Sequence, residues 1–473
     1  MTNSLDRRSF LQRGAVVTAG AVLAGGTQAL AAHGALAAPG RRGQAVQAPD
    51  NGGYGPIAPT RDRTTGEVLL WLPAGFEYAS FGHEASFAAS RGLPTAGSDG
   101  YPTPGRHDGM AAFPTSNDGI VRLVRNHEQG YSPVEGASRA YDRALIDDRD
   151  EAYDPMAAGG TTTLTFDTRS LELTDSFISL NGTSVNCAGG PTPWGSWLSC
   201  EETVNGTHNG FTEDHGYVFE VPADGGPVGG PYRAMGRFVH EAVAVDPATG
   251  IVYETEDSGE TSGFYRFLPN DPRDLAAGGQ LQMLAVKGEP GFQTFTGVSD
   301  RVGNPMPVEW VTIDDPDPTP ITTESVFAQG AAKGAAAFAR LEGCWYDGGS
   351  IFFNATSGGD HKAGQVWEYR PRGRSGGQLI LLFESPDRAL LDAPDNITVS
   401  PRGGLVLCED GGGEQFVRGL DERGQIFDLA KNSTSNAEFA GACFSPDGEV
   451  MFVNVQTPGV SFAIRGPWEK GAL

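Results

Sequence analysis

Short apolar runs separated by turn residues recur along the chain in a two-part pattern. The first part is a pair of apolar runs joined by a turn and ending in acidic residues, as in residues 241–257. The second part is a glycine followed by alternating aromatic residues and often a proline, as in residues 263–269. The runs are rich in β-branched and aromatic residues and are bounded by Asp-Pro, Pro-Asp-Gly or Gly-Gly turns, so each predicts a β-strand.

The two-part unit repeats at a nearly even spacing. Copies that begin at Glu342, Asp395 and Gly441 lie roughly 50 residues apart, and a less regular copy covers residues 195–222. Four strands per repeat at this period are typical of a β-propeller blade. The repeats number five or six, and we expect an all-β, six-bladed propeller with loop insertions. A β-sandwich or two small β domains would be the alternative, which the repeated unit disfavours.

The composition agrees with a turn-rich β protein. Of 473 residues, 67 are glycine and 32 are proline, while 39% are apolar, which is too many for a disordered chain. The 34 Lys and Arg residues face 59 Asp and Glu residues, giving a net charge of −25. This balance excludes nucleic acid as a partner. An anionic substrate would need local cations, which bound metal ions can supply.

The N-terminus predicts an export signal. The pair Arg7-Arg8 is followed by an Ala/Gly-rich apolar stretch over 15–24 and by small-residue cleavage sites that end at Ala31 or Ala37. The apolar stretch is shorter than the roughly 20 residues that a membrane span needs. We therefore expect recognition by the twin-arginine export machinery.

The expected organisation has three parts. Residues 1–37 are the twin-arginine signal peptide, residues 38–60 a flexible leader, and residues 61–473 a single propeller domain. The processed protein is then periplasmic or secreted, with no stable membrane insertion after cleavage.

Acidic residues fall at repeated positions of the unit. In a propeller, the first strand of each blade lines the axial channel, and several copies place acid at its start or at the end of the second strand. Carboxylates gathered in one channel repel one another unless a cation holds them. Hard oxygen donors suit Ca²⁺ or Mg²⁺, and a thiolate beside them suits a transition metal. The residues concerned are Glu241, Glu342, Asp395-Asn396, Glu256-Asp257, Glu409-Asp410 and Cys200-Glu201-Glu202.

Several of these residues have a second explanation. Glu256, Asp257 and Asp410 fit a solvated turn as well as a ligand role. Arg340 is expected to bind carboxylate or phosphate, with a surface salt bridge as the alternative.

The cysteines and one histidine also leave alternatives open. Cys344, Cys408 and Cys443 alternate with apolar residues and are expected in the core. Cys187 could form a disulfide with Cys200, although the two glutamates beside Cys200 favour a ligand role. His240 is expected to be a packing histidine rather than a ligand.

Five segments together resemble the PhoX-type alkaline phosphatases, from about residue 60 to the end of the chain. The twin-arginine signal also fits this family. The segments are Arg125-Asn126-His127-Glu128, residues 194–202, residues 236–246, residues 339–343 and Pro394-Asp395-Asn396.

The resemblance implies an iron–calcium cluster in the propeller channel and hydrolysis of small-molecule phosphomonoesters. Asn126 and Arg340 would contact the phosphate and serve catalysis. The metal ligands that the resemblance implies are Cys200, Glu201, Glu241 and Glu342, with Asp395, Asn396 and Glu409 as further contacts.

Two other classes of function remain as alternatives. A calcium-dependent propeller hydrolase of lactones or phosphotriesters would use Glu, Asn and Asp ligands without a thiolate, so Cys200 argues against it. A non-enzymatic propeller would bind a partner or use calcium only for stability, because a fold does not fix a function.

Overall fold

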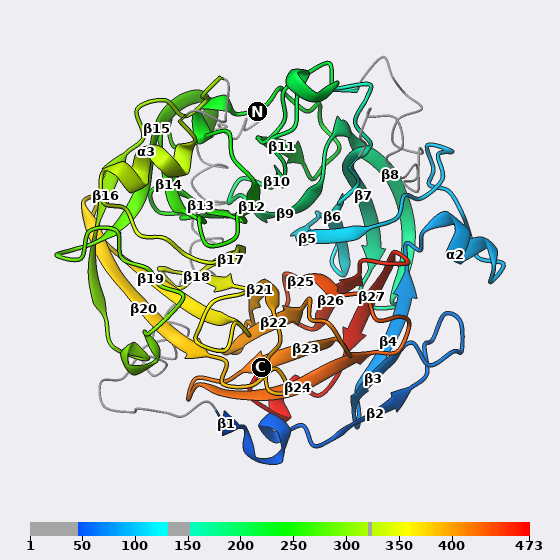
Figure 1. Cartoon of the computed structure of the whole chain (residues 1–473). Helices are drawn as coiled ribbons and strands as arrows, with labels where there is room; N and C mark the ends of the chain where they lie inside the picture. Colours follow the sequence, from blue (N-terminus) through cyan, green and yellow to red (C-terminus); the bar gives the residue numbers. More distant parts are fainter. Residues whose placement is uncertain (1–45, 131–151, 320–323) are drawn as a thin grey trace, which may run out of the picture.

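The computed structural model describes residues 46–130, 152–319 and 324–473. The export signal predicted for residues 1–37 lies outside this part of the chain. Figure 1 shows the described residues as sheets arranged around a central axis, with short helices in the connections. The fold is mostly β, as the sequence predicts, with the radial sheet arrangement of a propeller.

The described strands form five sheets, which are antiparallel apart from the short β1. The first sheet contains β5 (His107–Pro114), β6 (Ile120–His127), β7 (Gly159–Asp167) and β8 (Glu172–Thr183). The second contains β9 (Asn186–Pro191), β10 (Ser196–Glu201) and β11 (Val218–Pro222). The third, in bonded order, contains β12 (His240–Val245), β13 (Val252–Glu256), β14 (Phe264–Asp271), β15 (Asp274–Val286), β16 (Met306–Thr312), β20 (Gly376–Glu384), β19 (Gln365–Arg372), β18 (Ser350–Ala355) and β17 (Leu341–Asp347).

The other two sheets include strands from the beginning of the described chain. The fourth contains β21 (Pro394–Val399), β22 (Leu405–Glu409), β23 (Phe416–Leu420), β24 (Gln425–Asn432), β3 (Leu70–Pro73), β2 (Ile57–Thr60) and β1 (Val46–Gln47). The fifth contains β25 (Phe439–Phe444), β26 (Val450–Val455), β27 (Val460–Arg465) and β4 (Glu77–Phe81).

The helices are short and lie outside the sheets. No helix in the described ranges is long and apolar enough to cross a membrane. They are α2 (Ala85–Ala89), α3 (Val326–Ala332), η1 (Pro49–Gly53), η3 (Thr207–Asn209), η4 (Arg233–Met235), η5 (Ser299–Arg301) and η6 (Trp468–Lys470).

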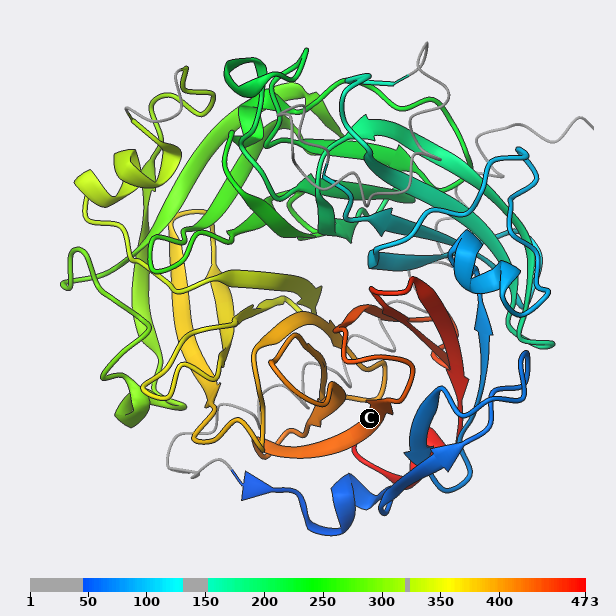
Figure 2. The same cartoon turned by 45° about the vertical axis from the view of Figure 1, so that its right-hand side comes forward.

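Pairing between the two ends of the described chain closes the ring. The early strand β4 pairs with the last strand, β27, and the two lie side by side in blue and red (Figure 2). Residues 46–60, expected to be a flexible leader, also join the ring, because β1 pairs with β24 and β2 with β3. The buried Tyr54 anchors them: its hydroxyl lies 3.0 and 2.8 Å from the backbone carbonyl oxygens of Trp468 and Leu473. These contacts correct the expectation drawn from the Pro/Gly-rich composition.

Six strands surround the axis and contact one another in circular order, namely β5, β9, β12, β17, β21 and β25. Near its start, each strand has a bulge in which two residues lie opposite one residue of the partner strand. Such bulges turn side chains toward a site instead of into the regular pleat. One residue of each bulge borders a space of only about 10 Å³ on the axis, and these residues are Gly109, Ala188, Ala242, Gly343, Asn396 and Gly441.

Small residues at this level let the six strands approach the axis closely. A Cβ atom at Gly343 would lie 2.6 Å from the backbone nitrogen of Ile397 and 2.8 Å from the Cα of Asn396. Both contacts are with backbone, which cannot move aside as a flexible side chain can. Steric contact with the neighbouring backbone therefore excludes a larger side chain at Gly343.

We expect Gly343→Ala to lower the free energy of unfolding by about 1–3 kcal/mol, because overpacking forces the strands apart. Denaturant unfolding of the purified protein measures the change. The matched control is Gly229→Ala, since a Cβ atom at Gly229 would meet nothing within 4 Å. Equal stability of the two variants would contradict the close packing on the axis.

Candidate metal centre and substrate site

The same hydrogen bond recurs at the start of all six axial strands. The residue before or at the strand start offers its carbonyl oxygen to the N–H of the residue that follows the neighbouring strand. Because every bond closes the same end of a strand pair, the bonded residues occupy equivalent positions. The donor and acceptor pairs are Glu128–Arg106 (2.9 Å), Glu202–Val185 (2.8 Å), Asp257–Val239 (3.1 Å), Thr356–Arg340 (2.8 Å), Asp410–Ala393 (2.9 Å) and Gln456–Glu438 (3.3 Å).

A second set of equivalent residues comes from the bulges. The first residue of the bulge carries an acid or a thiol in five of the six axial strands. In the sixth strand, Ala440 is paired with Asn454 and the bulge residues are Gly441 and Ala442, while Glu438 before the strand supplies a carboxylate. The five residues are Asp108, Cys187, Glu241, Glu342 and Asp395.

The two sets meet at one end of the channel. Four groups of side chains there have ligand atoms within 4.8 Å of one another: Cys187, Glu202 and Glu241; Asp108, Glu128 and Glu438; Glu241, Glu342 and Asp395; and Asp395, Asp410 and Glu438. Glu241, Asp395 and Glu438 each belong to two groups, so the groups form one continuous cluster. We call these nine residues the channel cluster.

Burial makes the negative charge of the channel cluster costly. Desolvation, reinforced by neighbouring carboxylates, raises the pKa of Glu241 and of Glu342 well above the usual value. The same two causes raise the pKa of Asp395 to about 7. Without cations, the cluster would have to take up protons instead of remaining ionised.

Arginine side chains of the described part of the chain balance some of this charge. In the described ranges, the ion pairs to the channel cluster come from Arg106, 2.7 Å from Glu128, and Arg340, 2.7 Å from Glu342. Among the residues that the structure describes, eight carboxyl groups and one thiol thus share ion pairs with two guanidinium groups. Carboxylate oxygens beside a thiol form a donor set for several metal ions, so the residues fit a metal centre.

The thiol of the channel cluster belongs to Cys187, whereas the sequence analysis selected Cys200. The Sγ of Cys187 lies 3.4 Å from the backbone oxygen of Glu241, and its thiol groups with the carboxylates of Glu202 and Glu241. Both cysteines border the same apolar cluster, but Cys200 belongs to none of the four ligand groups of the described residues. The two cysteines are free, so the alternative of a disulfide is also excluded. The bulge in β9 explains the difference, because it turns Cys187 toward the axis.

For two carboxylates, the sequence analysis selected the residue next to the one that joins the cluster. Glu201 points into the protein, where it bonds His215 at 2.6 Å, and Glu202 joins the cluster in its place. Glu409 likewise pairs with Arg418 at 2.8 Å, and Asp410 joins the cluster. Successive side chains near a strand end point to opposite sides, which explains both corrections.

The same alternation holds at the end of β13. Glu256 accepts hydrogen bonds from the hydroxyl of Tyr265 and the N–H of Gly263. Asp257 instead faces the guanidinium of Arg340, at 2.9 Å. The second member of each acidic pair is thus the one that faces the channel.

Both asparagines that the sequence analysis selected hold neighbouring groups in place through hydrogen bonds. Asn126 donates its amide hydrogens to the carbonyl oxygens of Cys187 (3.1 Å) and Ala188 (2.7 Å), which leaves no hydrogen for a phosphate. Asn396 donates to Asp395 (2.6 Å) and accepts from the N–H of Gly441 (2.6 Å). We therefore assign Asn126 to positioning Cys187 and Asn396 to positioning Asp395.

Arg340 lies at the edge of the cluster and is partly open to solvent. Its guanidinium is held by Asp257 and Glu342, while 36% of the side chain stays exposed. In the described part of the chain, its Nη1 makes no hydrogen bond. The fixed guanidinium can therefore donate to an incoming anion.

The remaining predictions about single residues agree with the structure. Cys344, Cys408 and Cys443 are buried in separate apolar clusters. His240 packs against Phe238, with ring centroids 3.6 Å apart.

Sequence reasoning missed Asp108, Glu128, Cys187 and Glu438 as cluster residues. One signal was present: His107-Asp108-Gly109 has the same pattern as the predicted His240-Glu241-Ala242. The positions of the others depend on strand-end geometry that the local sequence does not display.

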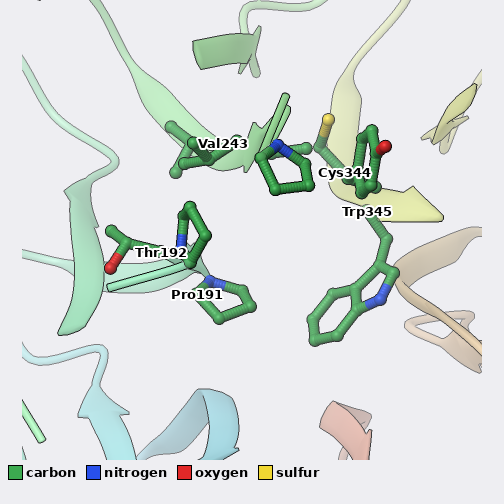
Figure 3. Close-up of a pocket in the computed structure, with 10 residues that line it drawn as sticks. Pro191, Thr192, Val243, Cys344 and Trp345 are labelled. Atoms are coloured by element: carbon green, nitrogen blue, oxygen red, sulfur yellow. The ribbon is translucent and has the colours of Figure 1, made fainter. Parts of the chain in front are cut away.

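A separate cavity of about 190 Å³ lies at the opposite ends of the axial strands (Figure 3). Val243, Cys344 and Trp345 line it together with Pro191 and Thr192. None of the channel-cluster residues borders this cavity. Its lining is largely apolar, so we place the chemistry at the acidic end of the channel.

The fold and the channel cluster define a propeller-like protein with the donor set of a metal centre. The family model "Alkaline phosphatase PhoX" matches residues 52–459. The chain belongs to the PhoX alkaline phosphatase family.

Three solved structures are similar to the chain, and the first of them supports the fold. The chain is similar to Pseudomonas fluorescens PhoX in complex with vanadate, with 16% identity, a TM-score of 0.62, and coverage of 88% of this chain and 99% of that one. A gluconolactonase from Xanthomonas campestris has 13% identity, a TM-score of 0.43, and coverage of 88% and 98%. Regucalcin, a calcium-binding protein from Agrobacterium tumefaciens, has 9% identity, a TM-score of 0.39, and coverage of 77% and 93%. No curated protein sequence matches the chain.

The two thiols provide the first test of the site. We expect Cys187→Ala to lower the transition-metal content of the purified protein severalfold, because it removes the one thiol of the channel cluster. Cys200→Ala is the matched control, since Cys200 is equally buried but lies outside the cluster. Elemental analysis measures both. An unchanged metal content in Cys187→Ala, or an equal loss in Cys200→Ala, would contradict the assignment.

A second test concerns the buried histidine behind Glu202. His215 lies between Glu201 (2.6 Å) and Asp154 (3.4 Å). Although burial opposes its charged form, the carboxylates of Glu201 and Asp154 and the hydrogen bond to Glu201 raise the pKa of His215 to about 9. The unfolded value is about 6.5. The resulting stability is therefore fully present below pH 6.5 and is lost as the pH rises through 9.

We expect His215→Gln to lower the free energy of unfolding by on the order of 3 kcal/mol at pH 6 and by much less at pH 9.5. Denaturant unfolding at the two pH values measures the difference. His208→Gln serves as the control, because His208 is exposed on the same segment. A loss that does not depend on pH would show that His215 is not charged in the folded protein.

Proposed function

We propose that the protein is an exported, metal-dependent phosphomonoesterase that releases inorganic phosphate from small phosphate esters. The observation that carries the proposal is the channel cluster, in which buried carboxylates and one thiol face two guanidinium groups. Membership of the PhoX alkaline phosphatase family supports the reaction class. The solved relative contains vanadate, described there as a transition-state analogue.

The fold that we infer for this function is a six-bladed propeller. The circular contacts of β5, β9, β12, β17, β21 and β25 support this number. The six equivalent hydrogen bonds at the strand ends support it independently.

The donor set favours calcium together with iron. Asp108, Glu128 and Glu438 offer only carboxylate oxygens, which suit Ca²⁺. Cys187 with Glu202 and Glu241 offers a sulfur beside oxygens, which suits a transition metal such as iron. When bound, the metal ions would neutralise charge that develops on the phosphoryl oxygens.

The protein's own residues supply orientation and charge. Arg340 would bind the phosphoryl group through its free Nη1, and its ion pairs with Asp257 and Glu342 fix its direction. Asn126 holds the backbone at Cys187, and Asn396 holds Asp395. Preorganised donors of this kind need little rearrangement as the reaction proceeds.

The thiol bears on the two alternative functions. A lactone or phosphotriester hydrolase that uses calcium alone, or a propeller stabilised by calcium, has no need for a cysteine among its carboxylates. Cys187 lies among them. This placement favours the phosphomonoesterase.

Glu342 tests the proposal most simply, because it contacts both the metal donors and Arg340. We expect Glu342→Gln to lower kcat on a phosphomonoester by on the order of 100-fold or more and to lower the metal content with it. Hydrolysis assays and elemental analysis on the same preparation measure both effects.

The matched control is Glu289→Gln, which removes a surface ion pair with Arg301. Chelation of the wild-type protein should also abolish activity, and calcium with iron should restore it. Full activity and full metal content in Glu342→Gln would contradict the assignment. The absence of phosphomonoesterase activity in metal-loaded wild type would contradict the function.

A further inference from the structure

A buried polar side chain occupies the same position in four of the repeats. It lies on the strand that pairs with the axial strand, two residues before the donor of the strand-end hydrogen bond. Each of the four side chains is fully buried. Cys200 and Cys408 stand at this position in the other two repeats. We call the four residues the second-strand donors, and they are Asn126, Thr255, Asn354 and Asn454.

Each second-strand donor bonds the backbone of the next axial strand around the circle. The acceptor is the carbonyl oxygen of the first bulge residue of that strand, and this residue belongs to the channel cluster in all four cases. A bulge residue is left out of the regular ladder, so a side chain can supply the hydrogen bond that the ladder does not. The donor and acceptor pairs are Asn126–Cys187 (3.1 Å), Thr255–Glu342 (2.6 Å), Asn354–Asp395 (2.7 Å) and Asn454–Asp108 (2.6 Å).

A second hydrogen bond fixes the orientation of Asn454. Its Oδ1 accepts from the hydroxyl of Ser461 at 2.6 Å, so its Nδ2 faces the carbonyl oxygen of Asp108. Ser461 in turn accepts a hydrogen bond from the guanidinium of Arg125 at 2.7 Å. A chain of three fully buried side chains thus holds the backbone of Asp108.

These bonds constrain the direction of the ligand side chains. Because the peptide group is planar, a fixed carbonyl oxygen fixes the orientation of the backbone from which the side chain leaves. Groups that hold a metal ligand from behind change the metal affinity by about 10–100-fold when they are lost. Asn454 stands in this relation to Asp108, and Asn126 stands in it to Cys187.

The two asparagines act on separate parts of the channel cluster. Asp108 belongs only to the group that it forms with two other carboxylates, those of Glu128 and Glu438. Cys187 belongs only to the thiol group, and these two groups have no residue in common. A change at one asparagine should therefore affect one group and spare the other.

We propose that Asn454 and Asn126 are positioning residues that set the affinity of the channel cluster for two different metals. Asn454 holds Asp108 for calcium, and Asn126 holds Cys187 for a transition metal such as iron. The inference rests on the metal ions of the proposed function and not on the hydrolysis of a phosphate ester. Each blade thereby controls the metal ligand that the next blade supplies.

The test measures bound calcium and iron in wild type, Asn454→Leu and Asn126→Leu by elemental analysis after equilibrium dialysis against a series of calcium concentrations. Leucine is similar in size to asparagine but donates no hydrogen bond. We expect Asn454→Leu to raise the free calcium needed for full occupancy about tenfold and to keep its iron content within about twofold of wild type. Asn126→Leu should lose iron severalfold and keep the calcium dependence of wild type.

The matched control is Gln365→Leu, which removes another fully buried amide that donates to a backbone carbonyl, that of Thr294 at 3.0 Å. It should lower the midpoint of denaturant unfolding and leave both metals unchanged. Asn454→Thr should bind calcium more tightly than Asn454→Val, because the two side chains have the same shape and only threonine donates. Thr255 makes the equivalent bond in its own repeat.

The pattern of loss separates positioning from general support of the fold. Equal loss of both metals in Asn454→Leu, unchanged calcium binding in that variant, or a wild type that binds no calcium would overturn the inference. If Asn454→Leu does not fold, equal calcium affinity of Asn454→Thr and Asn454→Val would overturn it. Phosphomonoester hydrolysis is assayed on the same preparations. A wild type that binds both metals without hydrolysing a phosphomonoester would contradict the proposed function alone, since the metal contents still decide the inference.

Discussion

Repulsion between buried carboxylates is the constraint on which the rest of the structure depends. The bulges of the axial strands place Asp108, Glu241, Glu342 and Asp395 at one end of the channel, and the strand-end hydrogen bonds bring further acids beside them. Burial and mutual repulsion raise the pKa of Asp395 to about 7. An arrangement of this kind remains ionised only with compensating cations, so the same geometry that concentrates the charge also provides a donor set that suits metal ions.

The surrounding residues serve this arrangement in two ways. Small residues such as Gly343 let the strands approach the axis, and Asn126 and Asn396 fix the backbone and the carboxylate next to them. Arg106 and Arg340 supply the protein's own positive charge at opposite edges. The residue before an axial strand is thus an arginine in two of the repeats, and in the repeat of Glu438 it is an additional acid. Small changes at equivalent positions convert a structural repeat into an asymmetric site.

The sequence predicts the fold class well, because turns and alternating strands are local features. It also places Glu241, Glu342 and Asp395 at the channel, because these residues begin regular copies of the repeat. It fails for Glu201 and Glu409 because adjacent acids at a strand end point to opposite sides, and composition alone does not say which faces the channel. The sequence does not predict the position of Cys187 for another reason. A bulge determines the direction of its side chain, and bulges depend on pairing between distant segments. Glu438 has no local signal at all.

Anomalous X-ray diffraction from crystals of the purified protein tests the central claim most directly. Data collected on both sides of the iron absorption edge would locate iron relative to the protein atoms. The account predicts an iron peak within bonding distance of the Sγ of Cys187 and the carboxylate of Glu241, with calcium among the remaining acids of the channel cluster. A channel without metal, in which the carboxylates are protonated and hydrogen-bonded to one another, would contradict it.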